Sequence, residues 1–177
     1  QSIALDTMVA AGSTLTLPLE FRYNSATTFT WTENFDGLTG VGMVASEFSD
    51  TTWKFAAPSE SFENKSLELG LTAPAVFAQI ESAGDGFALP TNKSDVYLEL
   101  DYKSNYEFSV GLIGDDLTPR PILNINPRNE WNKIYIQLAQ AVNAPQTSSR
   151  YKVYFRMVRS ESQENPRLFL DNIKLVY

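Results

Sequence analysis

Apolar and polar side chains alternate at every second position over much of the chain, which is the period of a β-strand with one buried face. The first such run extends from Leu15 to Tyr23, and its polar positions include Pro18. Because proline has no amide hydrogen to donate to a neighbouring strand, this run predicts a strand at the edge of a sheet.

Similar runs recur along the chain, separated by residues that favour turns. They predict strands over residues 26–32, 52–55, 67–71, 76–81, 96–102, 106–112, 122–125, 134–138, 151–157 and 168–177. Residues 140–143 favour one helical turn, which Pro145 would end. The runs 96–102 and 106–112, joined by a short turn, predict an antiparallel hairpin. Many short strands without a long helix predict an all-β fold, an antiparallel β-sandwich of the jelly-roll type.

The final run changes face in its middle. Leu168 and Leu170 share one parity, whereas Ile173 and Leu175 share the other. Since side chains alternate between the two faces of a strand, this shift by one residue requires a β-bulge. We expect the bulge at Asp171-Asn172.

Cysteine and histidine are both missing from the 177-residue sequence. Their absence removes disulfides, thiolate and imidazole metal ligands, and every Ser-His or Cys-His relay. A content of 43% hydrophobic and 20% charged residues is typical of a globular domain. We expect one domain over residues 1–177, with a jelly-roll core from 26 to 177 and an added strand or arm from 1 to 25.

The net charge of −7 argues against a nucleic-acid partner, because phosphate binding depends on clustered Lys and Arg. No apolar stretch approaches the roughly 18 residues that a transmembrane helix needs. No signal peptide is recognisable, so we expect a cytosolic chain or an exported one that has been trimmed. The absence of cysteine fits an exported bacterial protein.

Three short stretches carry a family resemblance: Glu33-Asn-Phe-Asp-Gly37, Trp131-Asn-Lys-Ile-Tyr-Ile-Gln-Leu138 and Leu170-Asp-Asn-Ile-Lys-Leu175. The last two resemble the closing strands of galactose-binding-like jelly rolls, most of all small modules of Bacteroidales surface lipoproteins. The first is similar to the acidic start of carbohydrate-binding modules with that fold. The resemblance implies non-catalytic glycan binding, a structural calcium ion and export. It also implies a lipid anchor upstream of Gln1, hence a place at the outer membrane or cell surface, or in the periplasm.

In such modules an acid at the start of the first strand meets an acid of the last strand at the calcium ion. Asp36 and Asp171 occupy those positions here, and Glu33 is a third candidate ligand. Calcium prefers several oxygen ligands, carboxylates among them. The alternative is that Asp36 belongs to an ordinary turn and that the Asp171 carboxylate caps local amides.

Sugar-binding sites combine aromatic planes with planar polar groups. If the predicted strands are neighbours, their outward positions form one such patch. The candidates are Tyr97, Glu99, Arg120, Tyr135, Tyr154 and Arg156, with Trp53 and Trp131 near the loops as further stacking residues. The alternative is that these residue types simply suit exposed strands and that Trp131 caps the core.

Catalysis would need two facing carboxylates. Glu99 and Asp101 share a predicted strand face, with Glu107 across the hairpin, and this resembles the Glu-x-Asp-x-x-Glu motif of laminarinase-like hydrolases. Ser104 stands where the third acid of that motif belongs. We therefore expect no enzymatic activity.

These observations predict a non-catalytic carbohydrate-binding or adhesive module of an exported cell-surface protein, whose partner is a glycan or another surface protein. The first alternative is a structural or protein-interaction sandwich without a sugar site. The second is a sandwich-type glycoside hydrolase. A binding module predicts exposed aromatics beside a groove, whereas an enzyme predicts paired acids with a raised pKa.

Overall fold

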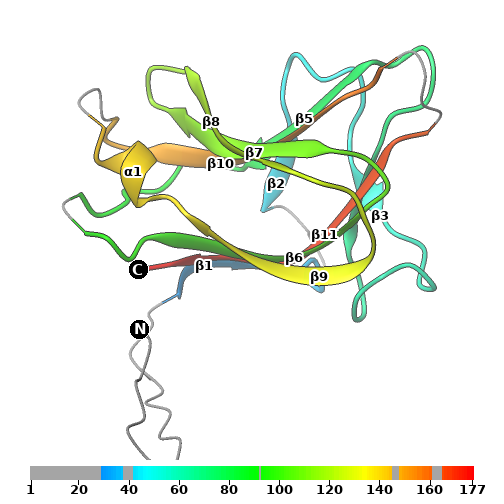
Figure 1. The fold of residues 1–177 in the computed structure, drawn as a ribbon, viewed down its shortest axis with the longest axis horizontal. Helices are drawn as coiled ribbons and strands as arrows, with labels where there is room; N and C mark the ends of the chain where they lie inside the picture. Colours follow the sequence, from blue (N-terminus) through cyan, green and yellow to red (C-terminus); the bar gives the residue numbers. More distant parts are fainter. Residues whose placement is uncertain (1–28, 38–41, 92, 145–147, 161–164) are drawn as a thin grey trace, which may run out of the picture.

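The computed structural model describes residues 29–37, 42–91, 93–144, 148–160 and 165–177. Two antiparallel β-sheets pack face to face over a shared apolar core (Figure 1). The fold is an antiparallel β-sandwich of the jelly-roll type, as the alternation predicts. The run at 15–23 and residues 26–28 lie outside the described residues.

One sheet, here called sheet A, has six strands. In spatial order they are β3 (Lys54–Phe55), β4 (Leu67–Gly70), β11 (Arg167–Val176), β6 (Tyr97–Ser104) and β9 (Arg128–Gln137), and β1 (Phe29–Glu33) pairs with the second half of β11. Sheet B consists of β2 (Met43–Ala45), β5 (Phe77–Ser82), β10 (Tyr151–Val158), β7 (Phe108–Gly114) and β8 (Pro119–Ile125). The short helix α1 (Ala139–Val142) follows β9, where one helical turn is predicted. No described helix has the length and apolar character to cross a membrane.

β6 and β7 lie in different sheets, so the predicted hairpin of residues 96–102 and 106–112 is wrong. β6 pairs with β9 and β11, whereas β7 pairs with β8 and β10. Residues 105–107 carry the chain from one sheet to the other. Alternation determines which side chains a strand buries, but it does not choose the neighbouring strand.

The bulge in β11 lies where the shift of parity places it. The pairing with β6 changes register between Asp171 and Lys174, and Asn172 has a φ of 46°. Asparagine enters this left-handed region more readily than most residues. As a result, Leu170 and Ile173 both face the core, and both are fully buried.

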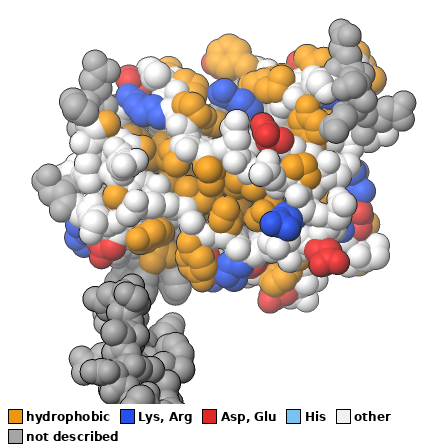
Figure 2. Space-filling view, viewed as in Figure 1, with side chains coloured by type: hydrophobic (Ala, Val, Ile, Leu, Met, Phe, Trp, Pro, Cys, Tyr) orange, Lys and Arg blue, Asp and Glu red, His pale blue; other side chains and the backbone are white. Residues whose placement is uncertain are grey.

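The side chains predicted to point inward form the core. Leu98, Ile136, Val153 and Phe155 are buried between the sheets, and Ile134 packs against them from a partly buried position. Along the edge of the sandwich where β8 and β9 lie, Figure 2 shows apolar side chains gathered between the two sheets. Burial of this continuous apolar layer is the main force that holds the sheets together.

Candidate functional site

A cleft of about 970 Å³ opens on the outer face of sheet B. The loop after β2 lines it on one side and the β7–β8 turn on the other, so the cleft runs across β5 and β10. Side chains of these strands that point away from the core form its floor. They include Phe77, Gln79 and Glu81 of β5, and Lys152 and Arg156 of β10.

Tyr154 also projects from β10 on this face, between Lys152 and Arg156. Its ring lies against Gly111 of β7, where an added Cβ would approach the tyrosine ring to 2.6 Å. Glycine at position 111 therefore makes room for the ring. In the described part of the chain, the Tyr154 hydroxyl is the only buried side-chain oxygen or nitrogen without a hydrogen-bond partner. Burial raises the pKa of Tyr154.

The guanidinium of Arg156 lies over two aromatic rings. Its Cζ is 4.9 Å from the centre of the Tyr154 ring and 5.5 Å from that of Phe77. Its Nε donates a 2.8 Å hydrogen bond to Oε1 of Gln79, the residue opposite it on β5. Two cation–π contacts and one hydrogen bond thus hold a planar polar group against an aromatic surface, a combination that suits sugar rings and their hydroxyls.

The charged groups at the other end of the cleft already have partners. Lys152 binds Glu81 at 2.9 Å, and Arg150 donates to the carbonyl oxygens of Asp85 and Gly86. The Asp115 carboxylate accepts hydrogen bonds from the side chain and backbone of Ser149, which lower its pKa. This end is therefore polar and negative, but already internally bonded.

Apolar side chains rise on both rims of the cleft. Phe48 in the loop after β2 is 75% exposed, and Leu117 in the β7–β8 turn is 80% exposed. Leu117 also has a φ of 59°, a conformation that costs energy for a residue with a branched side chain. Exposed apolar groups on the walls of a polar cleft are typical of a ligand-binding site.

The structure divides the predicted sugar-binding patch between the two outer faces of the sandwich. Tyr154 and Arg156 lie on sheet B, where Tyr154 is fully buried rather than exposed. Tyr97, Glu99 and Tyr135 lie together on sheet A, where Glu99 is opposite Tyr135. The condition for a single patch, that these strands are neighbours, is therefore not met.

The remaining predicted sugar-binding residues have local partners. Arg120 forms an ion pair of 2.8 Å with Asp116 in the β7–β8 turn. Trp53 donates its indole N–H to the carbonyl of Met43, and Trp131 donates to that of Glu60. Both tryptophans are only partly exposed and pack against neighbouring aromatic rings.

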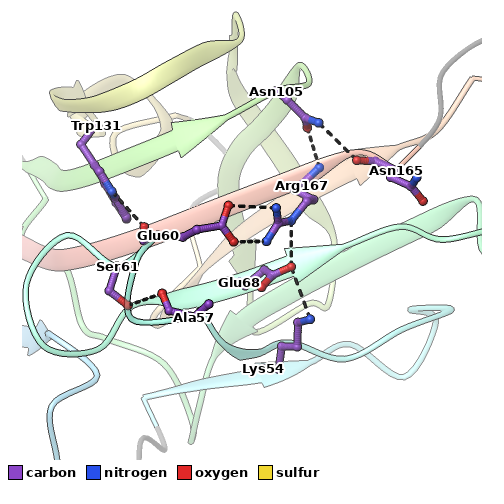
Figure 3. A network of polar contacts seen from close by, with 9 residues as sticks. All are labelled: Lys54, Ala57, Glu60, Ser61, Glu68, Asn105, Trp131, Asn165 and Arg167. Atoms are coloured by element: carbon purple, nitrogen blue, oxygen red, sulfur yellow. Dashed lines mark hydrogen bonds and ion pairs between the residues drawn. The ribbon is translucent and has the colours of Figure 1, made fainter.

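The segment between β3 and β4 lies across part of the outer face of sheet A (Figure 3). Arg167 of β11 binds both carboxylate oxygens of Glu60 from this segment and reaches the buried Glu68 of β4 at 2.9 Å. Trp131 of β9 bonds to the same segment and contacts Phe62. The chain itself thus occupies part of this face, whereas the cleft of sheet B is open.

The predicted calcium ligands Asp36 and Asp171 bind the same short segment of chain. Asp36 accepts hydrogen bonds from the amide of Lys65 and the side chain of Asn64, and Asp171 accepts one from the Ser66 hydroxyl at 2.8 Å. Burial raises the pKa of Asp171 to about 6, and the charges of Asp36 and Glu63 add to the rise.

The third predicted calcium ligand, Glu33, accepts a 2.7 Å hydrogen bond from the amide of Phe35. Among the described residues, no three acidic side chains are grouped so that they could hold a metal ion. The residues described provide two carboxylates near one another, Asp36 and Asp171, which is an incomplete ligand set for calcium.

The acids considered for catalysis are held by cations. Glu99 bonds to Lys133 at 2.8 Å and to Lys174 at 3.3 Å, and Asp101 lies 3.3 Å from Lys133. Burial raises the pKa of Glu99, but the two lysines outweigh burial and the net shift is downward. Glu107 is exposed in the connection to sheet B, so it does not face them. A general acid needs the opposite shift.

No family model and no curated protein matches this sequence. Solved structures do resemble the fold. A carbohydrate-binding module of family 28, specific for non-crystalline cellulose, has 14% identity and a TM-score of 0.56, over 81% of this chain and 91% of that one. A variant of the family 29 module CBM29-2, studied for its ligand recognition, has 10% identity and a TM-score of 0.55, over 85% and 91%.

A cleaved adhesin domain, K3, of Lys-gingipain from Porphyromonas gingivalis also resembles this chain. It has 10% identity and a TM-score of 0.55, over 85% of this chain and 98% of that domain. At such low identity these likenesses show the fold alone. The chain therefore has the β-sandwich architecture found in carbohydrate-binding modules.

Several residues of the cleft were not anticipated from the sequence, namely Phe48, Gln79, Glu81, Leu117 and Lys152. Two signals could have indicated them. A leucine among polar turn residues at 115–118 is unusual unless it contacts something. Three basic residues at alternate positions, 150, 152 and 156, with a neutral tyrosine at 154, mark one face of a strand.

Proposed function

We propose that this chain is a non-catalytic carbohydrate-binding module that holds a glycan in the cleft on the outer face of sheet B. The observation that carries the proposal is the composition of the cleft. Its floor combines the ring of Phe77 with a fixed guanidinium and a side-chain amide, and its rims carry Phe48 and Leu117. The volume of about 970 Å³ lies near the upper end of the usual range for ligand sites.

The physical argument follows from the chemistry of sugars. A pyranose ring presents apolar C–H groups on its faces and hydroxyls at its edge. In the cleft, Phe48 and Leu117 would contact the faces, while Arg156, Gln79 and the Lys152–Glu81 pair would bind hydroxyls. Since these polar groups are already held by their neighbours, little conformational entropy is lost when a ligand binds.

Two exposed aromatic residues on opposite faces provide a matched test. Phe48 lies at the cleft and is 75% exposed, and Tyr135 lies on sheet A and is 61% exposed. Neither is part of the core, so replacement of either by alanine should leave the melting temperature nearly unchanged. We expect Phe48→Ala to weaken glycan binding by about 1–2 kcal/mol, and Tyr135→Ala to leave it unchanged.

The assay is a glycan array followed by titration calorimetry on whichever glycans bind. If Tyr135→Ala abolished binding and Phe48→Ala did not, the site would lie on sheet A, as the sequence suggested for Tyr97, Glu99 and Tyr135. If the wild-type chain bound no glycan on a broad array, the structural or protein-interaction module would replace this proposal.

We also propose a structural calcium ion at Asp36 and Asp171. The proposal is supported by the buried carboxylate of Asp171, which lies near that of Asp36. Among the described residues, neither carboxylate forms an ion pair. Calcium that binds only the folded state raises the melting temperature by mass action. Identical melting curves in excess calcium and in chelator would refute the ion.

Export to a cell surface remains a proposal that rests on the resemblance and on the absence of cysteine. Detection of the native protein only in the soluble cytosolic fraction of its source would refute it.

A further inference from the structure

Arg156 differs from Lys152 because no acid among the described residues pairs with it, and from Arg150 because no backbone carbonyl does. Its one hydrogen bond is to the neutral amide of Gln79, and its other close neighbours are the rings of Tyr154 and Phe77. In the part of the chain that the structure describes, no acceptor meets its terminal nitrogens Nη1 and Nη2, and no acid forms an ion pair with it.

The residues opposite Arg156 on both neighbouring strands are neutral. Gln79 faces it from β5 and Ser109 from β7, and the Ser109 hydroxyl is itself bonded to Asn124 at 2.7 Å. An acidic residue at either position would have neutralised the guanidinium, as Glu81 does for Lys152. The exposed Glu47 also lines the cleft, but among the described residues it forms no ion pair with Arg156, so the terminal nitrogens of the guanidinium are available to a ligand.

The opposite end of the cleft has the opposite character. Asp85 and Asp115 line it, and Arg150 there is engaged by backbone carbonyls. Arg156 lies four positions after Lys152 on the same strand, a distance of roughly 13 Å along it. The cleft is thus polarised along β10, positive at Arg156 and negative beyond Lys152.

We propose that the cleft takes a glycan that carries a single carboxylate-bearing sugar, a uronic acid, seated on Arg156, with neutral sugars toward Asp85 and Asp115. The proposal rests on the proposed function and specifies its ligand. A guanidinium presents two parallel N–H donors that match the two oxygens of a carboxylate. The Nε bond to Gln79 and the two rings fix the plane of the guanidinium, so this fork is oriented before the ligand arrives.

The same polarity disfavours a glycan with a charge on every sugar. Such a chain would place anionic groups against Asp85 and Asp115, and the net charge of −7 would repel it further. The expected ligand is therefore a largely neutral polysaccharide with isolated uronic acids rather than a polyanion.

The test uses the full 177-residue chain and three polysaccharides: glucuronoxylan, the same glucuronoxylan with its carboxyl groups reduced to alcohols, and polygalacturonate. An arabinogalactan with terminal glucuronic acids and its carboxyl-reduced form provide a second backbone. Affinities are measured by titration calorimetry and affinity electrophoresis. We expect at least one native polysaccharide to bind about tenfold more tightly than its reduced form, a difference of about 1.4 kcal/mol. Polygalacturonate should bind no better than the reduced forms.

Substitutions of Arg156 separate charge from geometry. R156Q should bind the native and the reduced polysaccharide with equal affinity, while R156K, which keeps the charge but not the fork, should retain part of the difference. R128Q removes the same charge from the exposed Arg128 on sheet A and should change neither affinity. The melting temperature and the circular dichroism spectrum show that R156Q is folded.

Three outcomes would overturn the inference. Equal affinity of wild type for native and reduced forms would refute the uronic acid while leaving the proposed function intact. Binding of polygalacturonate more tightly than of either native polysaccharide would show a general anion site instead. Failure to bind these polysaccharides and every neutral glycan on the array would remove the proposed function as well.

Discussion

Replacing Arg167 by alanine should destabilise the fold strongly while leaving the cleft unaffected. Arg167 is the centre of the network in Figure 3, where it binds Glu60 through both terminal nitrogens and Glu68 through Nε. Glu68 is 5% exposed, and without Arg167 its remaining cation is Lys54 at 3.5 Å. The substitution therefore leaves a buried carboxylate only weakly compensated.

The magnitude follows from that burial. Removing one partner of a buried ion pair costs about 3–5 kcal/mol, because the other charge stays buried and unpaired. The Arg167 side chain is 35% exposed, so solvent already screens part of the interaction and about 2–4 kcal/mol is the expected loss. The guanidinium also lies 4.7 Å from the Phe169 ring, and the loss of this contact is included in that range.

The assay is urea unfolding followed by tryptophan fluorescence, and Trp131, bonded to Glu60, is a reporter within the network. The control is R167A/E68Q, in which the unpaired buried charge is also removed. This double variant should be more stable than R167A alone. If R167A lost less than about 0.5 kcal/mol, the network would behave as an ordinary surface ion pair and the reasoning from burial would fail.

Three further predictions concern other parts of the molecule. Asp171→Asn removes a carboxyl whose pKa in the folded protein is about 6 rather than 3.8. The variant and wild type are compared in chelator, so that calcium does not contribute. Because a raised native pKa makes ionisation unfavourable to the fold, wild type should lose stability relative to the variant by about 2 kcal/mol as the pH rises from 4 to 6. A difference independent of pH in denaturant titrations would contradict this. Gly111→Ala places a Cβ against the Arg120 carbonyl oxygen and the Tyr154 ring, so it should cost about 1–3 kcal/mol in thermal unfolding and weaken glycan binding. An unchanged melting temperature would show that the ring moves freely. Reducing-sugar assays on a broad polysaccharide panel should detect no hydrolysis, since two lysines lower the pKa of Glu99 and Asp101 lies in an ion pair with one of them; activity lost in E99Q would disprove this.

The alternation of side chains was sufficient to predict most strands, the inward set that includes Leu98 and Phe155, and the bulge at Asp171. These features depend on neighbouring residues of one strand, so a short stretch of sequence is enough to predict them. The pairing of strands is not local. For that reason the hairpin of 96–102 with 106–112 was wrongly predicted, and Tyr135 and Tyr154 were placed on one face although they lie on opposite sheets.

The cleft was harder to predict because its walls come from loops. Phe48 and Leu117 follow no periodic pattern, and their proximity depends on how β2, β5, β10 and β7 are ordered in sheet B. Arg156 was identified from its outward parity alone. The sequence could not show that Arg156 has no ionic partner, because its neighbours Gln79 and Ser109 come from two other strands.

The pairing of β1 with the end of β11 has a mechanical consequence. Phe29 lies opposite Val176, so the first and the last of the described strands run antiparallel, side by side. Tension applied through these two points pulls along the inter-strand hydrogen bonds. The bonds therefore break one after another, whereas a force parallel to the strands would load all of them at once. Under load, β1 should therefore detach first and act as an extensible tether, while the strands of sheet B, and the cleft they carry, remain unstrained.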